Sequence, residues 1–222
     1  MDGKPVVYLH PVGPLEKDDV DAMLRQARKA IGLAVEMGPP VAVPAGALDG
    51  LRGQIIAFRL LAAVPATPDA SPPPLTGHTT YGGLRPPGPP PGVTPPSPAG
   101  AGPPPPNPGP VPAFARIAVT DQDLFVPGQE FVLTMGDAKG RRAVLSTRRL
   151  KESFYKRKAD PAKQHGRAAR EFISAIGAAR GLLGCHDPYC VMAESHTVID
   201  VDRKNDRFCG HCNNLIHGRL RW

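Results

Sequence analysis

The chain has 222 residues, 29 of them proline, and its 27 lysines and arginines against 20 acidic residues give a net charge of +7. This length suits one compact domain or two small ones. No apolar run reaches the roughly 20 residues that cross a bilayer, and the N-terminus lacks a signal peptide's hydrophobic region, so we expect a cytoplasmic protein without a membrane partner.

The first 64 residues are predicted to begin an α/β domain. Residues 6–9 form a short apolar run typical of a buried strand. Asp18 can cap a helix, whose predicted apolar stripe is Val20, Leu24, Ala27 and Ile31. After Pro39 and Pro40, residues 41–43 are predicted to add a strand, and a second helix is predicted from about Asp49. Its predicted buried side chains are Leu51, Ile55, Phe58 and Leu61.

Residues 65–112 form a proline-rich insertion. They hold 20 of the 29 prolines and eight glycines, with Asp69 and Arg85 as the only charged residues. Such a segment can neither build a ladder of backbone hydrogen bonds nor bury much surface, so it is predicted to be disordered or polyproline-like. We favour a tolerated low-complexity insertion over a ligand for an SH3-type domain.

Residues 113–222 are predicted to complete the same domain. Residues 115–119 read as a strand, and 131–135 and 143–146 as two more, joined by a turn at 136–140. A helix is predicted from 161 to about 180, with Ala169, Phe172, Ile173 and Ile176 facing inward. The alternation of helices and strands indicates the α/β (α+β) class, a mixed sheet with parallel strands and an antiparallel edge.

The four cysteines lie close together in the sequence, as Cys185-x4-Cys190 and Cys209-x2-Cys212, with 18 residues between the pairs. Two close pairs at this separation can form a tetrahedral thiolate site for Zn²⁺. In a reducing compartment this reading is favoured over two disulfides. His211 lies inside the second pair, where we expect the thiolates to bind and the imidazole to stay exposed. The tail from Gly181 is too polar to pack without such an ion.

Several motifs together resemble the archaemetzincin family of zinc metallopeptidases. They are residues 120–128 (TDQDLFVPG) with Phe131 and Val132, residues 140–150 (GRRAVLSTRRL), and the cysteine pattern with Val191 and Met192 after its second member. The resemblance covers nearly all of the chain except the proline-rich insertion. It implies a compact metzincin-like domain with a mixed sheet and an active-site-type helix. It also implies that the cysteines hold a structural zinc, separate from the catalytic one.

The family's catalytic motif, HExxHxxGxxHC, is degenerate in this chain. Counted back from the first cysteine, the three histidine positions hold Ser174, Ala178 and Gly184, and the glutamate position holds Ala175. Alanine and glycine offer no ligand atom, and a serine hydroxyl is a poor zinc ligand at neutral pH. We therefore expect no catalytic zinc and no catalytic residue. Met192 corresponds to the methionine beneath the family's catalytic metal and is predicted to be a packing residue here.

The leading hypothesis is a catalytically inactive homologue that binds an extended peptide or protein along the strand edge 131–135. One alternative is an active peptidase with another ligand set. Its candidate ligands near the cysteines are His186, Asp187, Glu194, His196 and Asp200.

A second alternative is a zinc-stabilised nucleic-acid-binding protein. Residues 139–170 hold 12 lysines and arginines against two acids. The sequence Lys156-Arg157-Lys158, beside Phe154 and Tyr155, offers cations for phosphates and rings for base stacking. Against this reading, runs of charge are commonly just solvated surface, so we rank it below the peptide-binding hypothesis.

Overall fold

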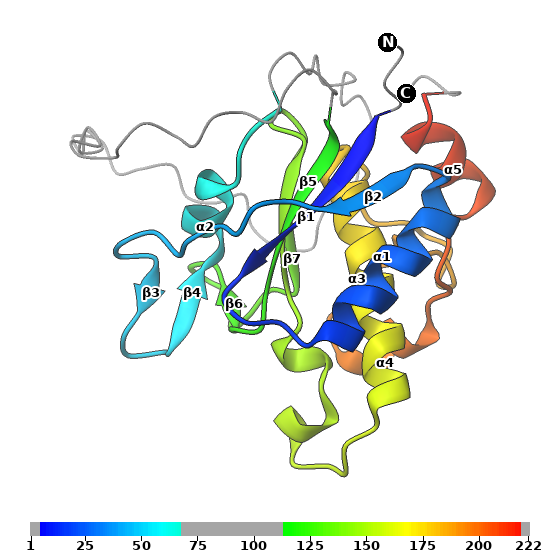
Figure 1. Ribbon diagram of the computed structural model, residues 1–222. Coiled ribbons are helices and arrows are strands. Elements are labelled where there is room, and N and C mark those ends of the chain that lie inside the picture. Colours follow the sequence, from blue (N-terminus) through cyan, green and yellow to red (C-terminus); the bar gives the residue numbers. More distant parts are fainter. Residues whose placement is uncertain (1–4, 68–112, 219–222) are drawn as a thin grey trace.

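A computed structural model describes residues 5–67 and 113–218 (Figure 1). Its main sheet has five strands in the order β2-β1-β5-β8-β7. They are β1 (Val6–Val12), β2 (Ala34–Met37), β5 (Ala113–Thr120), β7 (Thr134–Asp137) and β8 (Arg142–Ser146). The β1–β2, β1–β5 and β5–β8 pairs are parallel, and the β7–β8 pair is antiparallel. The predicted mixed sheet with an antiparallel edge is therefore confirmed.

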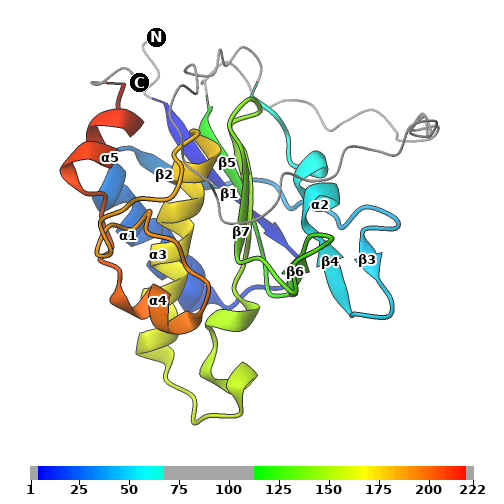
Figure 2. The same ribbon diagram turned by 180° about the vertical axis from the view of Figure 1, so that it is seen from behind.

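Both faces of this sheet are covered. Helices α1 (Lys17–Ile31) and α3 (Pro161–Ala179) pack together on one face, and α2 (Ala57–Ala63) lies on the other (Figures 1 and 2). The alternation along β5 accounts for this arrangement: Ile117 and Val119 join the core with α1 and α3, whereas Ala118 joins the core with α2. No helix in the described ranges is long and apolar enough to span a membrane.

The first helix and the strand after it differ from the prediction. The N-cap of α1 is Glu16 rather than Asp18, which lies in the first turn. The helix ends at Gly32 (φ 68°), and the chain passes at once into β2, where Val35 is fully buried. The predicted strand at 41–43 is wrong: β2 pairs with residues 6–9 of β1, and beyond β2 the Val41 N–H makes a single backbone hydrogen bond to the Pro11 carbonyl without continuing the ladder.

The predicted helix from Asp49 is also wrong over its first turns. The Asp49 carboxylate accepts hydrogen bonds from the backbone N–H groups of Leu51 and Arg52, and Gly53 has a φ of 64°, so the chain turns instead of coiling. A hairpin of β3 (Leu48–Asp49) and β4 (Gln54–Ile56) precedes α2, and β4 also pairs with β6 (Leu124–Phe125). Leu51 and Phe58 are exposed, contrary to the prediction, whereas Ile55 and Leu61 are buried as expected.

The C-terminal half follows the prediction more closely. Helix α3 buries Ala169, Phe172, Ile173 and Ile176, as expected. Strand β7 begins at Thr134, three residues later than predicted. The tail (residues 181–218) contains two short helices that were not predicted, α4 (Val198–Arg203) and α5 (Gly210–Ile216). The proline-rich insertion lies almost entirely outside the described residues.

An ion-pair network joins α3 to the tail. The Arg167 guanidinium is only 1% exposed and donates to the Asp202 carboxylate over 2.6 and 2.7 Å. It also lies 2.8 Å from a Glu152 carboxylate oxygen and donates to the Leu150 carbonyl. Burial alone would raise the pKa of Asp202, but the hydrogen bonds and charge of Arg167 outweigh burial and hold that pKa below its ordinary value.

Candidate metal centre and cleft

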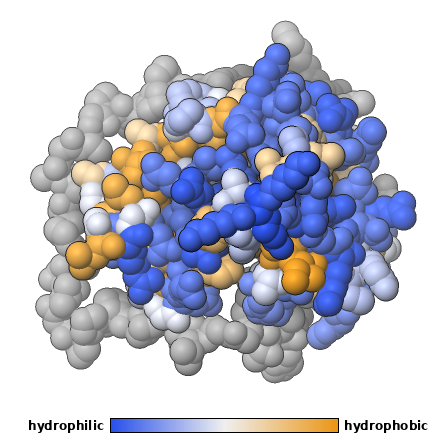
Figure 3. Space-filling model, turned by 90° about the horizontal axis from the view of Figure 1, so that it is seen from below, coloured by the Kyte–Doolittle hydropathy of each residue, from blue (hydrophilic) through white to orange (hydrophobic). Residues whose placement is uncertain are grey.

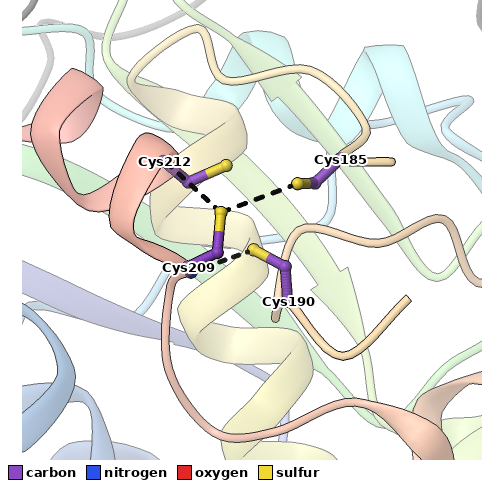
Figure 4. A group of neighbouring side chains, drawn as sticks. All are labelled: Cys185, Cys190, Cys209 and Cys212. Carbon is purple, nitrogen blue, oxygen red and sulfur yellow. Dashed lines mark hydrogen bonds between the residues drawn. The ribbon is translucent and has the colours of Figure 1, made fainter. Parts of the chain in front are cut away.

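The four cysteine thiols converge at one point, as their spacing predicts (Figure 4). Cys185 and Cys190 come from the loop after α3, Cys209 caps α5, and Cys212 lies in its first turn. All four Sγ atoms lie within 4.8 Å of one another, and those of Cys185 and Cys209 are 3.8 Å apart. Four sulfurs bound to Zn²⁺ at about 2.3 Å are about 3.8 Å apart in a tetrahedron. The thiols are free rather than paired in disulfides, and this group can hold a metal ion.

Backbone amides favour the anionic form of these sulfurs. The N–H groups of Met192 and Cys209 donate to the Cys190 Sγ over 3.4 and 3.3 Å, and the N–H of Cys212 donates to the Cys209 Sγ. A hydrogen bond from the Cys212 thiol, supported by these amides, lowers the pKa of Cys190 to about 5. The same contact raises the pKa of Cys212, and burial raises that of Cys185 to about 11. A thiolate, the form that binds metal, is thus already stabilised at Cys190.

His211 is exposed and lies outside the thiol group, in agreement with its expected position.

A cleft of about 830 Å³ lies between α3, strand β7 and the tail. Strand β7 is the last strand of the main sheet and pairs only with β8 among the described residues, so one of its backbone edges has no strand beside it. Residues of β7 that line the cleft are Thr134, Met135 and Gly136. The predicted edge at 131–135 is therefore placed at the cleft, although only its last two residues belong to the strand.

The family's three histidine positions face this cleft. Ser174 and Ala178 are four residues apart on α3 and both half-buried, and Gly184 lines the same cleft from the following loop. Ala175, at the glutamate position, is fully buried instead. Met192 is 4% exposed and packs on Gly177 of α3, where an added Cβ would come into contact with its Sδ.

A catalytic zinc does not fit these residues. Among the described residues, the cysteine cluster is the one group of three or more histidine, cysteine or acidic side chains that can hold an ion. The alternative ligands do not converge: His186 and Asp187 are exposed, and Asp200 forms the capping box of α4 with Thr197. Glu194 and His196 lie 3.4 Å apart, which supplies only two ligands.

The cleft also contains a buried ion pair that was not predicted from the sequence. Glu171 and Lys204 both line it and form an ion pair of 2.9 Å, with side chains only 3% and 2% exposed. Ser195 donates to the same Glu171 oxygen. Helical periodicity could have placed Glu171 beside Ser174, three residues later, but no local pattern points to Lys204.

Six of the twelve cations in the basic run pair with carboxylates. Lys156, Arg157 and Lys158 are exposed beyond the short helix η2 (Glu152–Tyr155), but Arg157 pairs with Glu152. The other paired cations of the run are Arg142, Arg149, Lys151, Lys163 and Arg167. The end of the molecule where α3 begins is mainly hydrophilic, with hydrophobic patches between (Figure 3). The pairing reduces the charge available to a phosphate backbone, but Lys156 and Lys158 stay exposed without an ion pair among the described residues.

Known structures share this architecture. Archaemetzincin from Methanopyrus kandleri superposes with a TM-score of 0.68 at 22% identity, covering 100% of this chain and 98% of that one. Archaemetzincin from Archaeoglobus fulgidus, in complex with malonate, gives 0.65 at 22% identity, over 95% and 99% of the two chains. A zinc-dependent peptidase from Methanocorpusculum labreanum gives 0.68 at 19% identity, over 95% and 99%. The chain thus has the fold of the archaemetzincin structures.

Sequence comparisons match the C-terminal half of the chain to one peptidase family. Residues 111–218 match the model of Peptidase family M54. The archaemetzincin of Methanopyrus kandleri is 34% identical over 105 residues, 47% of this chain and 57% of that protein, and that of Haloquadratum walsbyi is 35% identical over 104 residues, 46% and 60%. These alignments span less than two thirds of the relatives' length. Residues 111–218 are thus similar to Peptidase family M54 and to the archaemetzincins that align with them.

Proposed function

We propose that this protein binds an extended peptide in its cleft without hydrolysing it, and that it holds a single, structural zinc ion. The main support for this proposal is that none of the family's three histidine positions holds a histidine, while the cleft around these positions is retained. Ser174, Ala178 and Gly184 still line it beside the open edge of β7.

The proposed zinc ligands are Cys185, Cys190, Cys209 and Cys212, which supply a complete tetrahedral set. A set of four thiolates leaves no open position for water or substrate, so this ion would stabilise the fold rather than perform chemistry. Hydrolysis would need a second ion, or another nucleophile-activating group, in the cleft. The side chains at the family positions offer neither.

Peptide binding would use the edge of β7. An extended peptide beside this strand could continue its hydrogen-bond ladder, while every second side chain points into the cleft. The largely apolar walls, which include Leu182 and Met192, would hold those side chains.

Elemental analysis tests the metal part of the proposal. We expect one zinc per chain, and two zinc ions per chain would overturn the proposed loss of the catalytic site. The wild-type protein should also fail to cleave a diverse peptide library. Cleavage that stops when a chelator is added would contradict the proposed loss of peptidase activity.

A cleft-filling variant tests peptide binding. Ser174→Trp places an indole into the cleft from a half-buried position and is expected to abolish binding of an extended peptide library. Ser153→Trp is the matched control, because Ser153 is exposed on η2, outside the cleft. Equal binding by both variants would show that peptides bind elsewhere.

A further inference from the structure

The loss of the third histidine position makes room for a carboxylate. A Cβ added to Gly184 would lie 2.8 Å from Cγ and 2.9 Å from Oε1 of Glu194. The Glu194 side chain therefore occupies space beside the α-carbon at this position. Both residues line the cleft, and the Glu194 side chain is 36% exposed, so its carboxylate is accessible to a ligand there.

The charges in the cleft are unbalanced toward the negative. Three glutamates and one lysine line it. Lys204 is buried against Glu171 and neutralises it. Glu130 is 83% exposed, and its nearest cation, Arg149 at 3.8 Å, is held more closely by Asp123.

Glu194 has no lysine or arginine partner among the described residues. Its one ion-pair contact is the His196 imidazole at 3.4 Å, and that side chain is 75% exposed. Inside a concave site, a carboxylate without a lysine or arginine partner retains most of its attraction for the cation of a ligand.

We infer that the cleft selects peptides that carry an arginine or lysine side chain, whose cation pairs with Glu194. This inference rests on the proposed peptide binding and names its specificity. The apolar walls would pack against the aliphatic stem of such a side chain. A guanidinium can donate two parallel hydrogen bonds to one carboxylate, so arginine should be preferred over lysine.

The experiment compares three pools of capped, extended hexapeptides that differ only in having arginine, glutamine or glutamate at one position. Wild type is expected to bind the arginine pool roughly tenfold more tightly than the glutamine pool, and the glutamate pool most weakly. Glu194→Gln, which keeps the shape of the side chain, should abolish this order. Glu194→Arg should reverse it.

The matched control is Glu36→Gln, which removes the same charge from an exposed position on β2, at the opposite edge of the sheet from β7. It should retain the preference of wild type. If all three pools bind equally and Glu194→Gln changes nothing, the charge selection is refuted while peptide binding stands. If no pool binds to wild type, peptide binding itself is refuted, and the selection with it.

Discussion

Replacing Cys209 with serine should destabilise the whole domain rather than the tail alone. The tail contributes six large apolar side chains to the same core as the sheet, α1 and α3. They are Leu182, Val191, Met192, Val201, Phe208 and Ile216. Burial of each contributes about 1.5–3 kcal/mol, so the six together contribute on the order of 10 kcal/mol. The entire stability of a typical domain is about 5–15 kcal/mol.

A zinc ion held by the four cysteines would supply an apparent binding energy of about 10 kcal/mol or more, which is also folding energy. We therefore expect Cys209→Ser to lower both the zinc content and the melting temperature, and to accelerate hydrogen exchange within α3 as well as in the tail. Zinc content, thermal unfolding and hydrogen exchange with mass spectrometry measure these three effects.

His211→Ala is the matched control, since it changes an exposed residue in the first turn of α5, between Cys209 and Cys212, that is not one of the proposed ligands. It should keep one zinc and an unchanged melting temperature. The reasoning would be refuted if Cys209→Ser kept full zinc occupancy and stability. Faster exchange confined to the tail would refute the shared core as the route of destabilisation.

Three further outcomes are expected. Ser174→Ala should leave stability and zinc content unchanged, as the Ser174 hydroxyl makes no hydrogen bond within the described structure; a loss of more than about 1 kcal/mol would reveal a missed role. Replacing Ser174, Ala178 and Gly184 with histidine, together with Glu194→Ala to clear the space beside position 184, should raise the zinc content by one ion, because all three positions face one cleft; an unchanged content would mean that they do not converge. Asp202→Asn should cost about 1–3 kcal/mol at pH 7, because it weakens the pairing of buried Arg167. The folded-state pKa of Asp202 is lowered, so its contribution is present above the ordinary value near pH 4 and lost as the pH falls through the lowered pKa. Denaturant unfolding of wild type and variant should therefore converge once the pH falls below the lowered pKa of Asp202, and a gap that persisted in strong acid would contradict the charge-based explanation.

The sequence predicted best those elements whose signals are local. The apolar run at 115–119 and the helical period of residues 161–180 are each visible from a few residues, and both elements were located correctly as β5 and α3. The convergence of the thiols was also predictable, because pairs spaced for one tetrahedral ion restrict the fold of the loops between them.

The errors occurred where the outcome depends on distant partners. The region around Asp49 has apolar residues at nearly helical spacing, yet β4 forms because β6, some 70 residues later, offers an edge to pair with. The position of Glu194 could not be read from its neighbours either. It depends on the absence of a side chain at Gly184, ten residues earlier, on the other side of a loop.

The core that joins the tail to the sheet also constrains how the protein is made. On the ribosome, α3 is synthesised before Cys209 and Cys212, so the helix face that the tail will cover stays unprotected until both have emerged and bound their ion. Nascent chains should therefore be most vulnerable to aggregation in this interval. Scarcity of zinc in the cell would lengthen the interval, so the supply of the metal should govern how much of the protein accumulates.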